Sequence, residues 1–246
     1  ETYAKMLETG DCVRANKEES LYYYKLANDA RKAAKFNKDA STINNDNNDN
    51  DNNINSEKEE ERLSLKSTAD EGDTSAMFNY AVLVDRGDGV DANKEEAIKY
   101  YKMAIERGDA SAMNNYANML YNGDGVETNK EEALKYYKMA VDKGDASAMN
   151  NYANMLYKGE GTKANKEEAF KYYKLAINNG NNNAIFNYAV MLEKGCGSHR
   201  PDKEKAVHFY KLAADDGDVN AMFNYANMLE NGEGVKANKE KAIYYY

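Results

Sequence analysis

Asparagine recurs at fixed spacing along the chain, and its side chain is well suited to repeated hydrogen bonding. An amide carries donors and an acceptor together, so a row of amides can pair with the N–H and C=O groups of a peptide backbone without demanding a sequence. One position recurs as Asn79, Asn115, Asn151, Asn187 and Asn224, and a second position, three residues later, as Asn118, Asn154 and Asn227. The chemistry open to these rows is recognition of protein backbone.

The positions beside these rows vary from copy to copy and are the natural source of specificity. The residue before the first asparagine is Phe78, Asn114, Asn150, Phe186 or Phe223, and the residue one turn beyond the second position is Tyr121, Tyr157, Glu193 or Glu230. Aromatic side chains are favoured anchors at protein interfaces. We interpret the pattern as two phenyl-rich ends that flank an amide-rich middle.

Catalytic and metal-binding constellations are missing from the sequence. Nucleophilic catalysis needs a Ser or Cys beside a His and an orienting acid, but the two histidines are His199, expected in an exposed loop, and His208, expected on a helix surface. Glycine pairs recur along the chain, and Asp88, Asp124 and Glu160 stand between the glycines of three of them, which disfavours phosphate. The sequence therefore predicts no enzyme, no catalytic residue, no metal site and no cofactor.

Composition narrows the classes of partner. The 246 residues carry a net charge of -9, which disfavours nucleic acid and anionic lipid and favours basic protein partners. No apolar run approaches the roughly 18 residues that span a bilayer, so we expect no membrane insertion. Cys12 and Cys196 lie far apart, which favours a reducing, cytoplasmic location. Glu1 at the start and Tyr246 in an apparent helix suggest an excerpt of a longer chain.

A sequence repeat indicates which secondary-structure elements position these side chains. Two glycines separated by a single residue form a pair, and such pairs recur along the chain. The first pair begins at Gly87 and the second at Gly123, and successive pairs are 36, 36, 36 and 37 residues apart. A fixed period in this range is typical of stacked supersecondary units. Within one unit, Ala112, Tyr116 and Leu120 form one helical apolar face, and a second such face follows the glycines. Each unit is predicted to be two helices.

Capping residues mark where these helices begin and end. Asn129 with Glu132 three residues later has the spacing of an N-terminal cap, and the pattern recurs in other copies. Gly123 stands where a left-handed residue would end the first helix. Such short helix pairs are marginal alone, so each must stack on the next. We predict an all-α, right-handed superhelix, a solenoid of tandem antiparallel helix pairs with a period of about 36 residues.

The repeat unit resembles the Sel-one-like repeat family, which is related to the tetratricopeptide repeat. The residues that match the family pattern in order are Ala112, Ala117, Leu120, Gly123, Gly125, Val126, Ala133, Tyr136, Tyr137, Ala140, Val141 and Gly144. The resemblance covers residue 58 to the end and again residues 3–30, with Tyr100, Tyr136 and Tyr172 at a position where tryptophan is common.

The resemblance implies a function in protein binding. In tetratricopeptide arrays, the two asparagine positions face a concave groove and clamp an extended peptide, so the eight asparagines together with Phe78, Phe186, Phe223, Tyr121 and Tyr157 are the candidate partner-binding residues. Alternatively, the asparagines stabilise repeat stacking. Two further roles stay open: a building block of a large cytoskeletal or membrane-associated assembly, and an adaptor in ubiquitin-linked degradation.

Three segments are expected along the chain. Residues 1–36 form a partial repeat with an extended helix, and residues 57–246 form the tandem repeats, truncated at the C-terminal end. Residues 37–56, nearly all Asn and Asp in their second half, have too little apolar surface to bury and are expected to form a disordered loop within a degenerate repeat. Pro201 distorts one later unit, where Asp202 is the expected helix cap.

Overall fold

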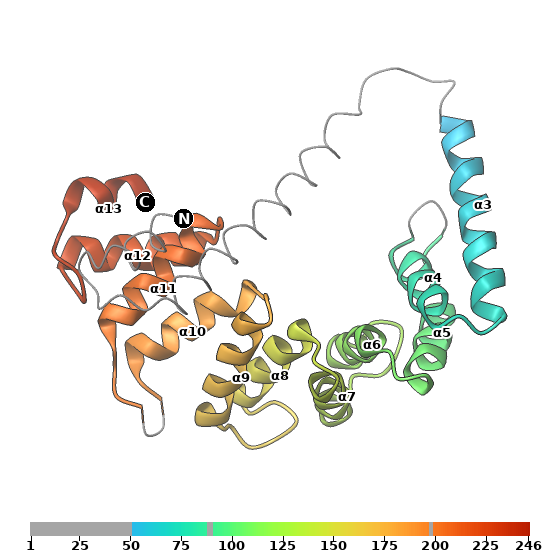
Figure 1. Ribbon diagram of the computed structural model, residues 1–246, viewed down its shortest axis with the longest axis horizontal. Coiled ribbons are helices and arrows are strands. Elements are labelled where there is room, and N and C mark those ends of the chain that lie inside the picture. Colours follow the sequence, from blue (N-terminus) through green and yellow to red (C-terminus); the bar gives the residue numbers. More distant parts are fainter. Residues whose placement is uncertain (1–50, 88–90, 197–198) are drawn as a thin grey trace. The chain divides into compact units, whose positions relative to one another are not determined.

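The computed structural model describes residues 51–87, 91–196 and 199–246, with side chains from residue 59 onward. Predictions for residues 1–50 lie outside the described residues. Within the described ranges the chain forms eleven helices that follow one another in sequence order (Figure 1). They are α3 (Asp51–Asp70), α4 (Thr74–Arg86), α5 (Lys94–Glu106), α6 (Ala110–Asn122), α7 (Lys130–Asp142), α8 (Ala146–Lys158), α9 (Lys166–Asn178), α10 (Asn183–Lys194), α11 (Lys203–Asp215), α12 (Val219–Asn231) and α13 (Lys239–Tyr245).

Each helix from α4 to α12 packs on the helix before it and the helix after it. The even-numbered helices are the first helices of successive pairs and the odd-numbered helices from α5 onward are the second helices. In the described part of the chain there is no β-strand, only one isolated bridge between Cys196 and His199. The predicted all-α solenoid of tandem helix pairs is confirmed.

Side-chain caps fix the starts of both helix types. Asn129 accepts a hydrogen bond from the backbone N–H of Glu132 at 3.0 Å, as predicted, and Asp202 caps α11 in the same way. The first helices use aspartate, a cap that sequence analysis did not single out: Asp109 accepts from the backbone N–H of Ala112 at 2.6 Å. Gly123 closes α6 with φ 76°, the left-handed conformation expected there.

Small and aromatic side chains together build the core. Alanine side chains such as Ala112 and Ala133 are fully buried, which lets neighbouring helix backbones approach closely. Tyr116 of α6 packs edge to face on Tyr136 of α7 with ring centroids 5.0 Å apart. Tyrosine suits these positions because a buried ring can carry its hydroxyl to a polar partner at the edge of the core.

Where the second glycine of a pair is described, at Gly125, Gly161 and Gly234, it lies where one repeat approaches the next. A Cβ atom on Gly161 would lie 2.5 Å from the backbone oxygen of Lys130, so no side chain fits there. The residue before Gly161 completes the junction, because Glu160 pairs with the Lys130 ammonium at 2.8 Å. Lys94 with Asp124 and Lys203 with Glu233 form the same pair at other junctions. Sequence analysis did not foresee these inter-repeat ion pairs.

Two segments differ from expectation. Helix α3 begins at Asp51, so the expectation of a disordered loop is wrong for residues 51–56; the rest of 37–56 lies outside the described residues. A helix nucleated among the Glu and Lys residues that follow extends backward because each added residue gains one hydrogen bond. In the unit containing Pro201, α10 begins at Asn183, and Asn182 at its N-cap position makes no side-chain capping hydrogen bond. None of the helices in the described ranges is both long and apolar enough to cross a membrane.

Candidate functional site

A pocket of about 270 Å³ lies between the first helices α6 and α8, beside Tyr137 of α7. It brings together four of the predicted binding residues. Its lining consists of Asn118, Tyr121, Asn122, Tyr137, Asn151, Asn154, Met155 and Lys158. We call this the amide pocket. Helical periodicity explains its composition, since Asn118 and Asn122 stand one turn apart on α6, as do Asn154 and Lys158 on α8.

Amide side chains bond to one another from repeat to repeat along the first helices. Asn151 of α8 donates to the Oδ1 atoms of Asn114 and Asn118 of α6, at 3.1 and 3.3 Å. Asn187 of α10 donates to Oδ1 of Asn154 of α8 at 3.2 Å. These bonds support the structural role that sequence analysis kept as an alternative for part of the asparagines.

Buried tyrosines of the second helices complete this network. The hydroxyl of Tyr137 donates to Oδ1 of Asn118 at 2.5 Å, and that of Tyr173 donates to Oδ1 of Asn154 at 2.6 Å. Burial raises the pKa of both phenols, which keeps them protonated and able to donate. Each of these two amide oxygens therefore accepts two hydrogen bonds, the usual capacity of a carbonyl oxygen.

The nitrogen atoms of the same amides remain available. Among the described residues, no hydrogen-bond acceptor pairs with Nδ2 of Asn118 or of Asn154. The Lys158 ammonium at the rim of the pocket likewise has no ion-pair partner within 4 Å in this part of the chain. The amide pocket therefore offers N–H donors and one positive charge, which suit carbonyl or carboxylate oxygens.

The tyrosine at the edge of the pocket is held by the junction between repeats. The Tyr121 hydroxyl donates to Glu160 at 2.6 Å, and the Lys130 ammonium donates to the other oxygen of that carboxylate at 2.8 Å. The hydrogen bond from Lys130, followed by that from Tyr121, lowers the pKa of Glu160. The two bonds orient the ring of Tyr121 beside the pocket.

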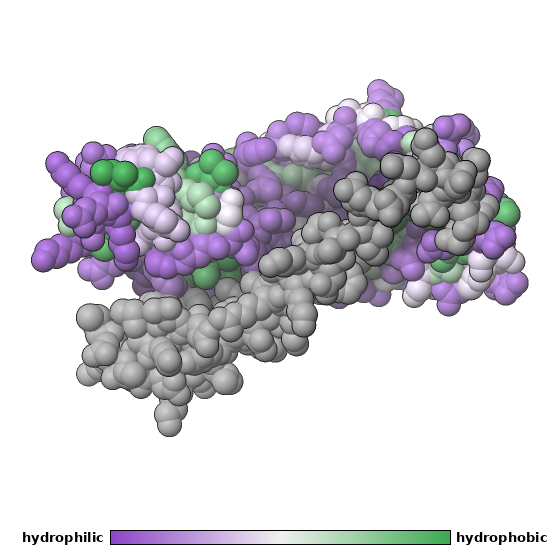
Figure 2. Space-filling model, turned by 90° about the horizontal axis from the view of Figure 1, so that it is seen from above, coloured by the Kyte–Doolittle hydropathy of each residue, from purple (hydrophilic) through white to green (hydrophobic). Residues whose placement is uncertain are grey.

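The other predicted residues lie along the first helices outside the amide pocket. Phe78 packs against Tyr101 and Phe186 against Tyr210, with centroids 6.2 and 6.0 Å apart, while Phe223 is 56% exposed. The remaining predicted residues are Asn79, which is exposed, and Asn115, Asn224, Asn227 and Tyr157, which are partly exposed. Hydrophobic residues gather at the end carrying α10 to α13, whereas the middle is mainly hydrophilic (Figure 2).

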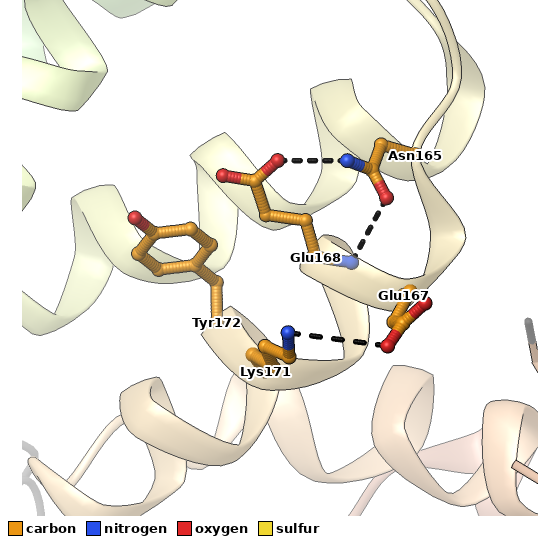
Figure 3. A pocket seen from close by; sticks show the side chains of 5 residues that line it. All are labelled: Asn165, Glu167, Glu168, Lys171 and Tyr172. Carbon is orange, nitrogen blue, oxygen red and sulfur yellow. Dashed lines mark hydrogen bonds and ion pairs between the residues drawn. The ribbon is translucent and has the colours of Figure 1, made fainter. Parts of the chain in front are cut away.

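A second kind of pocket lies at the start of a second helix. At the start of α9, the Asn165 amide donates to Glu168 at 2.8 Å, and Lys171 lies 4.0 Å from Glu167 (Figure 3). The same arrangement of Asn, two Glu, Lys and Tyr lines a pocket at the start of α7. The cap itself is Asn165, whose Oδ1 accepts from the backbone N–H of Glu168 at 3.1 Å, as the asparagine–glutamate spacing predicts.

The two histidines have different surroundings. His199 is exposed and stacks near Phe170, with centroids 4.6 Å apart, as expected for a loop residue. His208 lies on α11 and is partly rather than fully exposed; its ring packs against Phe209, and burial lowers its pKa to about 4. Within the described residues, no group of three His, Cys, Asp or Glu side chains is placed to hold a metal.

The fold is a helical-repeat solenoid with a polar pocket on its first helices. The model of the Sel1 repeat matches residues 3–32, 74–109, 110–145, 146–181, 182–218 and 219–246. The chain therefore belongs to the Sel1 repeat family, whose members generally serve as protein-interaction scaffolds.

Solved structures show the same fold. The Sel1 repeat protein from Oxalobacter formigenes is 29% identical with a TM-score of 0.67, and the match covers 71% of this chain and 69% of that one. The protective antigen c5321 of uropathogenic Escherichia coli strains is 24% identical with a TM-score of 0.69, covering 74% of this chain but only 38% of its own. No curated protein matches the chain.

Sequence reasoning missed several residues that shape the site. Sequence analysis named Tyr137 only as part of the family pattern and did not single out Tyr173, and it did not foresee that their hydroxyls bond to the second asparagine row. A signal existed, because the tyrosines follow Asn118 and Asn154 by 19 residues in both repeats. Lys158 carried no such signal, since Asn122 stands at the same place one repeat earlier.

Proposed function

We propose that the chain is a non-catalytic scaffold that binds an extended segment of a partner protein along α6 and α8. The observation that supports this most is the hydrogen-bond state of the amide pocket. The oxygens of Asn118 and Asn154 are already used within the protein, so their N–H groups are left to donate to carbonyl oxygens of an extended chain. Phe186 and Phe223 lie further along the first helices as anchors for apolar residues.

The experiment uses aspartate substitutions that separate binding from folding. Asn118→Asp with Asn154→Asp keeps an oxygen for Tyr137 and Tyr173 but removes the N–H donors. Peptides selected from a random library on the full chain supply the probe, and fluorescence polarisation measures their affinity. We expect roughly tenfold weaker binding by the double variant, because hydrogen bonds in a desolvated site are costly to lose. Unchanged affinity would refute the proposal.

A matched control carries the same change in charge. Asn183→Asp with Asn220→Asp alters two exposed asparagines in the first turns of α10 and α12, away from the amide pocket. We expect this control to bind the selected peptides as the unaltered chain does. Equal losses in both variants would show that net charge, not the amide pocket, governs binding.

A second candidate function is that of a building block in a larger assembly. Large apolar side chains are exposed on the last two helices, at Val219 (75%), Ile243 (75%) and Tyr244 (81%). Exposed apolar clusters favour contacts with other proteins. Light scattering of the full chain over a concentration range distinguishes the candidates, because a building block that associates through this end has a mass that rises with concentration.

A further inference from the structure

Three sites of the same composition occur at the starts of α5, α7 and α9. Each has a glutamate in the first turn and, one turn later, a tyrosine that packs edge to face on a buried tyrosine of the preceding first helix. The three sets are Glu96, Tyr100 and Tyr80; Glu132, Tyr136 and Tyr116; and Glu168, Tyr172 and Tyr152. We call them the first, second and third Glu–Tyr pockets.

The first Glu–Tyr pocket already holds an ammonium group. Lys66 of α3 donates to the hydroxyl of Tyr100 at 2.8 Å and to the Glu96 carboxylate at 3.2 Å. Its Nζ atom also lies 5.0 Å from the ring centroid of Tyr100 and 5.2 Å from that of Tyr80. A carboxylate, a phenol and two aromatic faces together form a binding site for a primary ammonium ion.

In the second and third Glu–Tyr pockets, no lysine of the described residues bonds to the glutamate, although Lys135 and Lys171 also line them. These pockets lie in hollows of about 350 Å³ at α7 and 490 Å³ at α9. In the third, Asn165 holds one carboxylate oxygen of Glu168, and the other oxygen lies on the side of Tyr172 (Figure 3). Throughout the described ranges, no ion pair joins Glu132 or Glu168 to a cation, unlike Glu96.

The chain's own lysines reproduce the ring contacts of Lys66 but not its bond to the glutamate. Lys102 and Lys138 occupy the position of Lys66 one and two repeats later. Lys138 forms an ion pair with Asp142, and its Nζ atom lies 6.0 Å from the ring centroid of Tyr172. The exposed Lys102 lies 5.2 Å from the ring centroid of Tyr116. In the described residues neither lysine has a hydrogen bond to Glu132 or Glu168.

The glutamate is not required to build the helix start. In α11 and α13 lysines, Lys205 and Lys241, stand at its place, yet Asp202 and Asn238 cap those helices through the backbone N–H groups of these lysines at 3.0 and 2.9 Å. A carboxylate at this position in α5, α7 and α9 therefore does more than capping requires, and in α5 its further role is to bind an ammonium group.

We propose that the second and third Glu–Tyr pockets bind lysine side chains of a basic partner protein. The net charge of -9 attracts such a partner, and each pocket offers the groups that hold Lys66 in the first one. The interaction surface is formed by the second helices α7 and α9 and is separate from the amide pocket, so this proposal goes beyond the peptide-binding function.

A defined peptide tests the proposal on the full chain. The probe is a blocked hexapeptide with two lysines, and the comparison peptides carry acetyl-lysine or arginine in their place. NMR titration follows the ring signals of Tyr136 and Tyr172. We expect the lysine peptide to shift these signals, the acetylated peptide to leave them unchanged, and the arginine peptide to bind more weakly because the pockets suit a compact ammonium group.

Matched charge variants locate the binding. Glu132→Gln with Glu168→Gln keeps the capping geometry, since glutamine also serves in the capping box. We expect it to weaken binding of the lysine peptide by roughly tenfold, the effect of losing charge-assisted hydrogen bonds. The control, Glu127→Gln with Glu204→Gln, removes the same charge from two exposed sites and should bind normally.

Three results would overturn the proposal. The first is equal binding of the lysine and acetyl-lysine peptides, and the second is tighter binding of the arginine peptide. The third is a fall in Tm for Lys102→Ala and Lys138→Ala as large as that for Lys66→Ala, since the chain's own lysines would then fill the pockets. If the amide-pocket variants bind the selected peptides normally, the proposed function is refuted without any change in the result of the lysine-peptide titration. The two proposals are therefore tested independently.

Discussion

Replacing Gly161 by alanine tests how closely successive repeats approach. Gly161 has φ 70°, and the left-handed conformation costs a residue with a side chain roughly 1–2 kcal/mol. The new Cβ would also lie 2.5 Å from the backbone oxygen and 2.8 Å from the carbonyl carbon of Lys130, which cannot swing aside as a side chain could. Such overpacking adds roughly 1–3 kcal/mol. We expect Gly161→Ala to lower the free energy of unfolding by roughly 2–5 kcal/mol in total.

Gly144 provides the matched comparison. It has φ 90°, so alanine is strained there too, but a Cβ would meet no atom within 4 Å. Gly144→Ala should therefore cost only the conformational part, roughly 1–2 kcal/mol. Urea denaturation followed by circular dichroism gives both values, and hydrogen exchange locates the loss, because repeat arrays can unfold in segments. Equal losses in the two variants would refute the close approach of the repeats.

Three further predictions follow from single side chains. Asn151→Ala should destabilise the chain by roughly 1–3 kcal/mol because it removes donors to two amide oxygens, whereas exposed Asn79→Ala should change stability by less than about 0.5 kcal/mol, both measured by urea denaturation. The pKa of Glu160 is lower in the folded chain than its ordinary value of 4.5, so the stability this residue adds is present above pH 4.5 and is lost as the pH falls through the folded-state pKa. Glu160→Gln should therefore flatten this part of the plot of Tm against pH. An NMR titration of His208 should give a midpoint near pH 4, and a midpoint near 6.5 would contradict its burial.

The repeat architecture could be predicted because every level of the sequence agrees on it. The glycine pairs fix the period, the apolar faces fix two helices per unit, and caps such as Asn129 fix the helix starts. Where local signals compete, prediction failed. Residues 51–56 have the composition of a loop, but α3 extends into them because helix elongation is cooperative.

The site was predictable in its residue types but not in its hydrogen bonds. Spacing along a helix identified Asn118 and Asn154, yet it could not show that Tyr137 and Tyr173 donate to their oxygens. These bonds depend on how the second helix crosses the first, which is a property of packing. For the same reason the sequence could not show that Lys66 reaches Glu96 and Tyr100 across a repeat boundary.

Side-chain amide signals of the full chain, followed by NMR during titration with a library-selected peptide, test the binding account most directly. The account predicts that the NH₂ signals of Asn118 and Asn154 shift in proportion to occupancy, because these groups lose water and gain a peptide oxygen. It also predicts that the NH₂ signal of Asn151, already bonded within the protein, moves less. Saturating binding with no change at Asn118 and Asn154 would contradict the account.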